Sequence, residues 1–170
     1  MADVFDLYGN LNLAVNLLHT RTGDDTCVTS DPLIKTIVTA FTYGTDAAEA
    51  DKVFHERRTL ADGAAQTYQL AVGQTPRLSE TVSFATVKAI VIYSTSADNK
   101  VLTLSAGVSG LTGWLGDVAT DTIDVQPGGL FVLTAPNTGY TCEGAADEIT
   151  VTNAAGGSST FDIIVIGTSA

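Results

Sequence analysis

The sequence predicts an all-β fold, an antiparallel β-sandwich or jelly roll of about ten strands with a less regular N-terminal segment. From Gln66 onward, apolar and polar residues alternate at period two, and β-branched residues are frequent. Turns rich in Gly, Asn, Asp and Pro separate these runs at spacings of roughly 8 to 12 residues. The length of 170 residues fits one domain.

The strands expected after residue 65 follow one another at short intervals. They are Gln66–Ala71, Thr81–Thr95, Val101–Ser105, Thr122–Val125, Leu130–Thr134, Tyr140–Glu143, Glu148–Thr152 and Thr160–Ile166. The last of them is apolar on both faces, which predicts a central position in a sheet. The loops Pro127–Gly129 and Asn153–Ser159 are typical of hairpin turns.

The first 65 residues are predicted to form an extended N-terminal segment, packed on the same domain, that makes contacts with other subunits. Asn10–Leu17 alternates apolar and Asn residues, which favours a half-buried strand; a helix over Leu7, Leu11, Val15 and Leu18 is the alternative. Ile34–Thr42 and Lys52–Leu60 look extended. Residues 66–170 are expected to form the sandwich core.

Composition argues against several classes of protein. A formal charge of −11 repels phosphate backbones and anionic lipid, so nucleic acid and membrane surfaces are not expected partners. No apolar run reaches the ~18 residues that a membrane helix needs, and residues 1–6 do not resemble a secretory signal. Cys27 and Cys142 lack a CxxC spacing, which favours two free thiols over a disulfide or a zinc site.

No catalytic motif is found, so neither an enzymatic activity nor a cofactor is expected. Gly107–Gly110 departs from the nucleophile-elbow spacing, and His19 and His55 lie in no metal-binding frame. A pair of glycosidase carboxylates cannot be tested from sequence. The acidic stretches are best interpreted as a solvated surface, and Asp117–Asp124 is the best of them as a candidate calcium loop.

Two features suggest binding surfaces. Trp114 lies between glycines and could offer its ring to a sugar, although such a residue more often plugs the end of a sandwich. Arg57 and Arg58 form the main basic cluster and suit pairing with carboxylates of this chain or of a neighbouring subunit.

Five segments together resemble structural proteins of tailed-bacteriophage particles, those that decorate or project from the head. They are Phe41–Asp51, Arg58–Asp62, Val87–Ile92, Val125–Gly129 and Ile164–Thr168. The resemblance implies a β-sandwich or jelly-roll subunit, a trimer, that binds the capsid shell and carries no catalytic residues.

The first functional hypothesis is therefore a head decoration or cement protein on the virion surface, whose partners are copies of itself in a homotrimer and the major capsid protein. An apolar strand containing Leu11, Leu13, Val15 and Leu17 is the expected interface, together with Arg57 and Arg58. The alternative is a sandwich module that binds carbohydrate or a host surface through its Gly-rich loops and Trp114.

Overall fold

The computed structural model confirms the all-β prediction. Eleven strands and no helix occur in the described part of the chain, and the strands form three antiparallel sheets. The sequence predicted about ten strands. No segment of the described chain is a helix long and apolar enough to cross a membrane.

The described residues cover most of the chain. They are residues 7, 9–22, 28–74, 81–96, 100–115, 120–144 and 146–169, with only the backbone described at 19–22 and 28–31.

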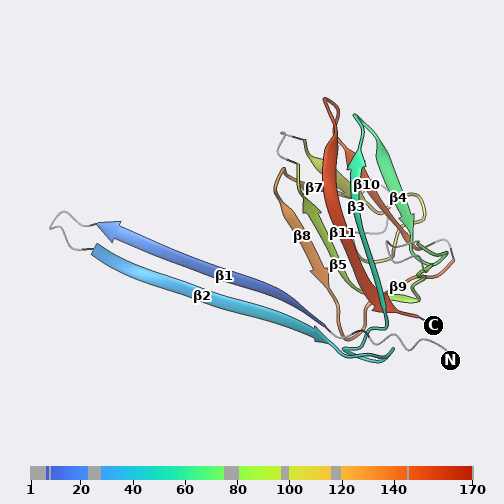
Figure 1. The fold of residues 1–170 in the computed structure, drawn as a ribbon, viewed down its shortest axis with the longest axis horizontal. Helices are drawn as coiled ribbons and strands as arrows, with labels where there is room; N and C mark the ends of the chain where they lie inside the picture. The colour runs from blue at the N-terminus through green and yellow to red at the C-terminus, as the bar shows by residue number, and fades with distance from the viewer. Residues whose placement is uncertain are drawn as a thin grey trace.

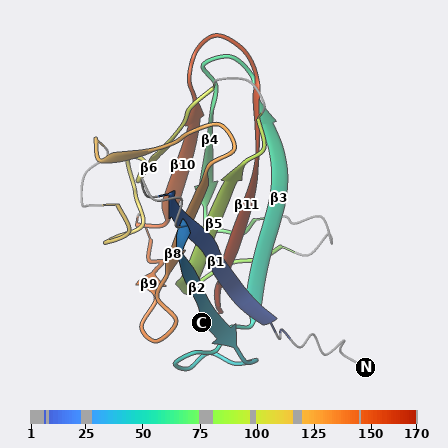
Figure 2. The same cartoon turned by 90° about the vertical axis from the view of Figure 1, so that its left-hand side faces the viewer.

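The first sheet is a two-stranded ribbon, here called the arm. It consists of β1 (Gly9–Thr22) and β2 (Val28–Phe41), which pair with each other and with no other described strand. Figure 1 shows the arm leaving one end of the remaining structure, here called the body (residues 42–169), and extending well beyond it; in Figure 2 the arm points toward the viewer. The expected strand over Asn10–Leu17 is confirmed, and the helical alternative is wrong.

The second sheet contains five strands in the order β3-β11-β5-β8, with the short β9 pairing with β5. Their bounds are Lys52–Leu60 for β3, Ser159–Thr168 for β11, Thr86–Ser94 for β5, Leu130–Thr134 for β8 and Tyr140–Thr141 for β9. As predicted from its apolar character on both faces, β11 lies centrally, between β3 and β5.

The third sheet contains four strands in the order β4-β10-β6-β7. Their bounds are Ala65–Gln69 for β4, Glu148–Asn153 for β10, Leu102–Ser105 for β6 and Thr122–Val125 for β7. The expected boundary after residue 65 thus falls one residue into β4, and β3 on its N-terminal side also belongs to the body.

The four- and five-stranded sheets share one hydrophobic core. Strand β11 buries Phe161, Ile163 and Val165, and β10 buries Ile149 and Val151 in the same cluster. Strand β10 alternates between buried and half-buried positions throughout, and β11 does so from Ser159 to Gly167, as expected for sheets with one face covered. The period-two pattern in the sequence is therefore the pattern of this core.

Neither of the two expected hairpins forms. The Pro127–Gly129 turn leads from β7 to β8, and residues 154–158 lead from β10 to β11, yet in each case the two strands belong to different sheets. The turn chemistry itself is as expected, since Gly128 and Gly156 have φ of 71° and 111°. Turn residues fix where the chain bends, but the sheet in which the next strand pairs depends on its other neighbours.

A β-bulge lies at the end of the five-stranded sheet nearest the arm. The register of β11 against β5 shifts between Ile166 and Gly167. A Cβ atom on Gly167 would lie 2.1 Å from the carbonyl oxygen of Thr86 and 2.8 Å from Cδ1 of Phe84. Only glycine fits there without movement of the backbone.

Candidate functional site: the arm and the outer sheet face

The arm is a long ribbon held together by its own backbone pairing. Its register runs from Gly9 opposite Phe41 to Thr22 opposite Val28, without a bulge. Fourteen residues per strand at ~3.3 Å per residue make the arm about 46 Å long. Because an isolated two-stranded hairpin is at best marginally stable in water, a ribbon of this length is expected to need a further partner.

One face of the arm is apolar along most of its length. Opposite residues of an antiparallel pair share a face, so the odd-numbered residues of both strands lie together; we call this the odd face. Its described members are Leu11, Leu13, Val15 and Leu17 on β1, and Leu33, Lys35, Ile37, Thr39 and Phe41 on β2. Leu13, Leu17, Leu33 and Ile37 are 42%, 60%, 54% and 51% exposed.

The opposite, even face is mixed. On β1 it carries Asn10, Asn12 and Asn16 along with Ala14 and Leu18. On β2 it exposes Ile34 and Val38, at 74% and 55%. Polar amides therefore interrupt the apolar side chains of this face, and the odd face is the more continuous apolar surface.

The end of the odd face nearest the body packs on the body. Phe41 is buried in a small cluster with Ala50 and Ala89, and Leu11 and Ile166 pack against that cluster. Ala89 and Ile166 are directly paired residues of β5 and β11, and they point away from the main core. The odd face thus begins on the outer face of the five-stranded sheet, and Figure 2 shows the arm in front of that sheet.

Much of the outer face of the five-stranded sheet is apolar. Val53, Ile164, Val91 and Val132 from its four long strands lie on this side, next to Ile166. Leu130 and Tyr93, directly paired at one end, are 53% and 42% exposed, and Val53 is 40% exposed. Sequence reasoning missed this surface, although the signal was present: β11 is apolar on both faces, and in this fold the core covers only one of them.

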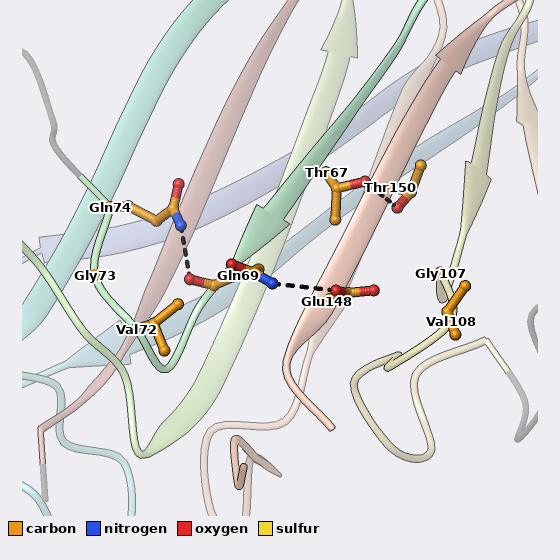
Figure 3. A pocket seen from close by; sticks show the side chains of 9 residues that line it. All are labelled: Thr67, Gln69, Val72, Gly73, Gln74, Gly107, Val108, Glu148 and Thr150. Carbon is orange, nitrogen blue, oxygen red and sulfur yellow. Dashed lines mark hydrogen bonds between the residues drawn. The ribbon is translucent and has the colours of Figure 1, made fainter. Parts of the chain in front are cut away.

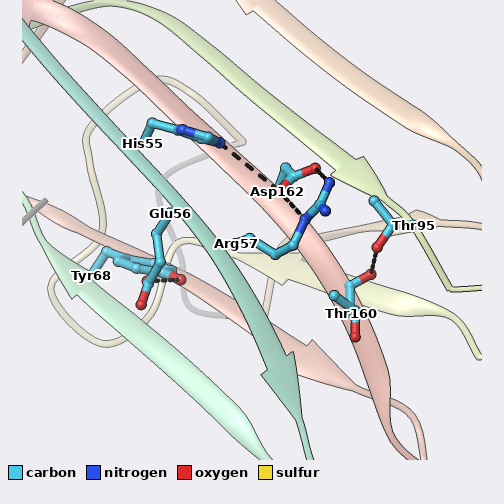
Figure 4. Close-up of polar contacts among 7 residues, drawn as sticks. All are labelled: His55, Glu56, Arg57, Tyr68, Thr95, Thr160 and Asp162. Atoms are coloured by element: carbon cyan, nitrogen blue, oxygen red, sulfur yellow. Dashed lines mark hydrogen bonds and ion pairs between the residues drawn. The ribbon is translucent and has the colours of Figure 1, made fainter. Parts of the chain in front are cut away.

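Arg57 and Asp162 make the strongest polar contact on this outer face. Nε and Nη2 of Arg57 donate to Oδ1 and Oδ2 of Asp162 at 2.8 and 2.7 Å, and Nε2 of His55 lies 3.9 Å from Oδ1 (Figure 4). The hydrogen bonds from Arg57 lower the pKa of the Asp162 carboxyl. Arg57 is therefore already paired within the chain.

Arg58, the next residue of β3, lies on the opposite face of the sheet. Its Nη1 donates to Oε1 of Glu56 at 3.0 Å. The Tyr68 hydroxyl donates to Oε2 of Glu56 at 2.9 Å (Figure 4). Burial and the bond to Glu56 raise the pKa of Tyr68. This group links the edge strands of the two body sheets, so both arginines predicted as interface residues make ion pairs within the body.

Trp114 is buried rather than presented on a loop. It is 5% exposed and makes an edge-on contact with the ring of Phe131 at a centroid separation of 6.1 Å. Its Nε1 finds no acceptor among the described residues. In this position the ring closes the core and does not offer a face to a sugar.

A shallow groove of about 720 Å³ lies on the four-stranded sheet, away from the arm. On its floor the hydroxyl oxygens of Thr67 and Thr150 lie 2.9 Å apart, and Nε2 of Gln69 donates to Oε1 of Glu148 at 3.3 Å (Figure 3). Val72 and Val108 are exposed at its rim. Among the described residues that line it, Glu148 is the one carboxylate, so they do not supply the carboxylate pair of a glycosidase.

The remaining candidate ligands do not converge in the described part of the chain. Cys142 is a free, buried thiol, and its burial, together with the nearby Asp147 carboxylate, raises its pKa to about 12. Cys27, His19 and Asp117 have no described side chains. No three His, Cys, Asp or Glu side chains that the structure describes are placed to share a metal ion.

No protein-family model, curated protein or solved structure matches the chain. The odd face of the arm, the outer face of the five-stranded sheet and the groove are therefore the features that bear on function.

Proposed function

We propose that this protein is a structural subunit of a multi-subunit particle, in which the arm attaches each subunit to its neighbours. The observation that carries the proposal is the projecting arm with an odd face of four large apolar side chains that are 42–60% exposed. Contiguous apolar surface on a monomer marks an interaction site, and an unsupported two-stranded ribbon gains stability from a partner.

The finer proposal is that the body is a jelly-roll β-sandwich. Numbered from β3, successive strands cross between the two body sheets, with two exceptions: β6 and β7 are neighbours in the four-stranded sheet, and β8 and the short β9 both pair with β5. The resulting orders, β3-β11-β5-β8 and β4-β10-β6-β7, support a roll of eight main strands in two sheets. Jelly rolls are common in viral capsid proteins, although fold alone does not fix function.

Together with the sequence resemblance, this topology favours a decoration or cement protein of a tailed-phage head. Its partners would be copies of itself, in a trimer, and the major capsid protein, at the outer surface of the virion. The acidic charge of −11 suits a surface that stays clear of packaged nucleic acid. The proposal assigns no catalytic step and no cofactor.

Two measurements test this function. Mass spectrometry of purified particles from the phage that encodes the chain should detect it in many copies, and light scattering of the isolated protein should give an oligomer. A chain that stays monomeric at all concentrations and is absent from particles would overturn the proposal.

Carbohydrate binding is the second candidate, favoured by the groove of Figure 3. Its Thr, Gln and Glu side chains can hydrogen-bond sugar hydroxyls, and jelly rolls also occur in lectins. Screening Gln69→Leu and the wild type on a glycan array tests it: a glycan signal that the variant loses supports the candidate, and no signal from either protein removes it.

A further inference from the structure

The arm and the outer sheet face are two walls of one apolar surface. They meet at the cluster of Phe41, Ala50 and Ala89, where Leu11 and Ile166 also pack. Beyond this cluster the arm leaves the sheet, as Figure 1 shows. The odd face and the outer sheet face both have exposed apolar side chains.

Both walls expose apolar side chains. The exposed apolar stretch of the odd face, from Leu13 opposite Ile37 to Leu17 opposite Leu33, is about five residues long and two strands wide, and covers roughly 160 Å² at ~3.3 Å per residue and ~4.8 Å per strand. Val53, Tyr93 and Leu130 add exposed apolar surface on the outer sheet, and contiguous apolar surface of this kind marks an interaction site. A partner that covers only one wall leaves the other in water.

The charges favour a second copy of this chain as that partner. Residues 9–41 hold two Lys and Arg against three Asp, whereas residues 42–170 hold fourteen Asp and Glu against six Lys and Arg. Two acidic bodies repel each other, but a nearly neutral arm can lie on an acidic body at little electrostatic cost.

We infer that the odd face of the arm of one copy packs on the outer face of the β3-β11-β5-β8 sheet of a second copy. This inference rests on the proposed function, and it names the contact that joins the subunits. Packing of arm on sheet covers both apolar walls in every copy, because each copy gives one arm and receives one in a closed assembly. Packing of arm on arm would leave Leu130, Tyr93 and Val53 uncovered.

Cross-linking between two single-cysteine variants tests the contact directly. Leu17→Cys places a thiol on the odd face and Leu130→Cys places one on the outer sheet, both in a background with Cys27→Ser; Cys142 is buried. Mixed and treated with a short bismaleimide, the two variants should form a covalent heterodimer. Efficient cross-linking of Leu17→Cys alone would instead show arms packed on each other and would overturn the inference.

Charge insertion provides a second, matched test. Val53→Asp puts a carboxylate on the outer sheet, at a side chain 40% exposed, and should weaken self-association about 30-fold or more, as loss of an interface hot spot does. Val108→Asp makes the same change at a 94% exposed valine by the groove and should leave it unchanged. Equal effects of the two variants would contradict the inference.

These outcomes separate the inference from the proposed function. If the protein assembles but neither the mixed cross-link nor the effect of Val53→Asp appears, the arm-on-sheet contact is wrong and the structural role stands. If the wild type does not assemble with itself but binds to capsids lacking it, the arm's partner is the capsid protein and the inference fails. If it does neither, the proposed function fails as well.

Discussion

Replacing the exposed apolar side chains of the odd face should abolish assembly without unfolding the body. In the variant, Thr replaces Leu13, Leu17, Leu33 and Ile37. Threonine keeps the preference for strands and adds a hydroxyl. None of these four side chains belongs to the two buried clusters of the described chain. The change is therefore confined to surface that the isolated subunit leaves in water.

The expected loss follows from the exposed fractions. The four side chains are 42%, 60%, 54% and 51% exposed, so a partner would cover about half of each. Full burial of a Leu or Ile stabilises by roughly 1.5–3 kcal/mol, so the exposed half of each contributes about 1 kcal/mol and the four together about 4 kcal/mol. At 1.4 kcal/mol per tenfold change, the dissociation constant should rise about 1,000-fold.

Sedimentation velocity over a dilution series measures this change, with circular dichroism as the check on the fold. The control carries Thr at Leu18, Ile34 and Val38 on the even face, which are 65%, 74% and 55% exposed. These side chains are more exposed but lie on the other face. Weaker assembly of the odd-face variant but not of the control therefore indicates a specific contact rather than non-specific hydrophobic association. The reasoning is refuted if the control weakens assembly as much as the odd-face variant, or if the odd-face variant changes the dissociation constant less than tenfold.

Three further predictions concern the body. Gly167→Ala should lower the free energy of unfolding in urea by roughly 1–3 kcal/mol, because the added Cβ meets backbone atoms at the bulge. The control Gly9→Ala adds a Cβ with no atom within 4 Å and should change this free energy by less than about 0.5 kcal/mol. With Cys27 replaced by Ser, Cys142 should react with a thiol reagent at pH 8 only after denaturant is added, since burial raises its pKa to about 12; fast reaction in buffer would contradict its burial. Asp162→Asn should lower the urea midpoint at pH 7. Because the folded-state pKa of Asp162 is lowered, its stabilisation is present above the ordinary aspartate pKa of about 4 and is lost below it, so the two midpoints should converge in acid; a constant gap would exclude the ion pair as the cause.

Local pattern was sufficient to locate the strands. Lys52–Leu60, Thr122–Val125 and Leu130–Thr134 have the bounds that alternation and turn residues predicted. The strand Val28–Phe41 begins earlier than the predicted Ile34, because its pairing with β1, rather than its own periodicity, sets its length. Pairing partners were beyond local pattern, as the two absent hairpins show.

The sequence by itself determined that this protein is all-β, where its turns fall, and that Leu11, Leu13, Val15 and Leu17 share one face, because side-chain direction in a strand depends only on residue parity. Only the tertiary structure decided that this face stands clear of the core on a projecting arm, that Trp114 is buried, and that both arginines are paired within the chain. The physical reason is that burial and ion pairing depend on contacts between residues far apart in sequence. Arg57 and Asp162, 105 positions apart, meet because β3 pairs with β11.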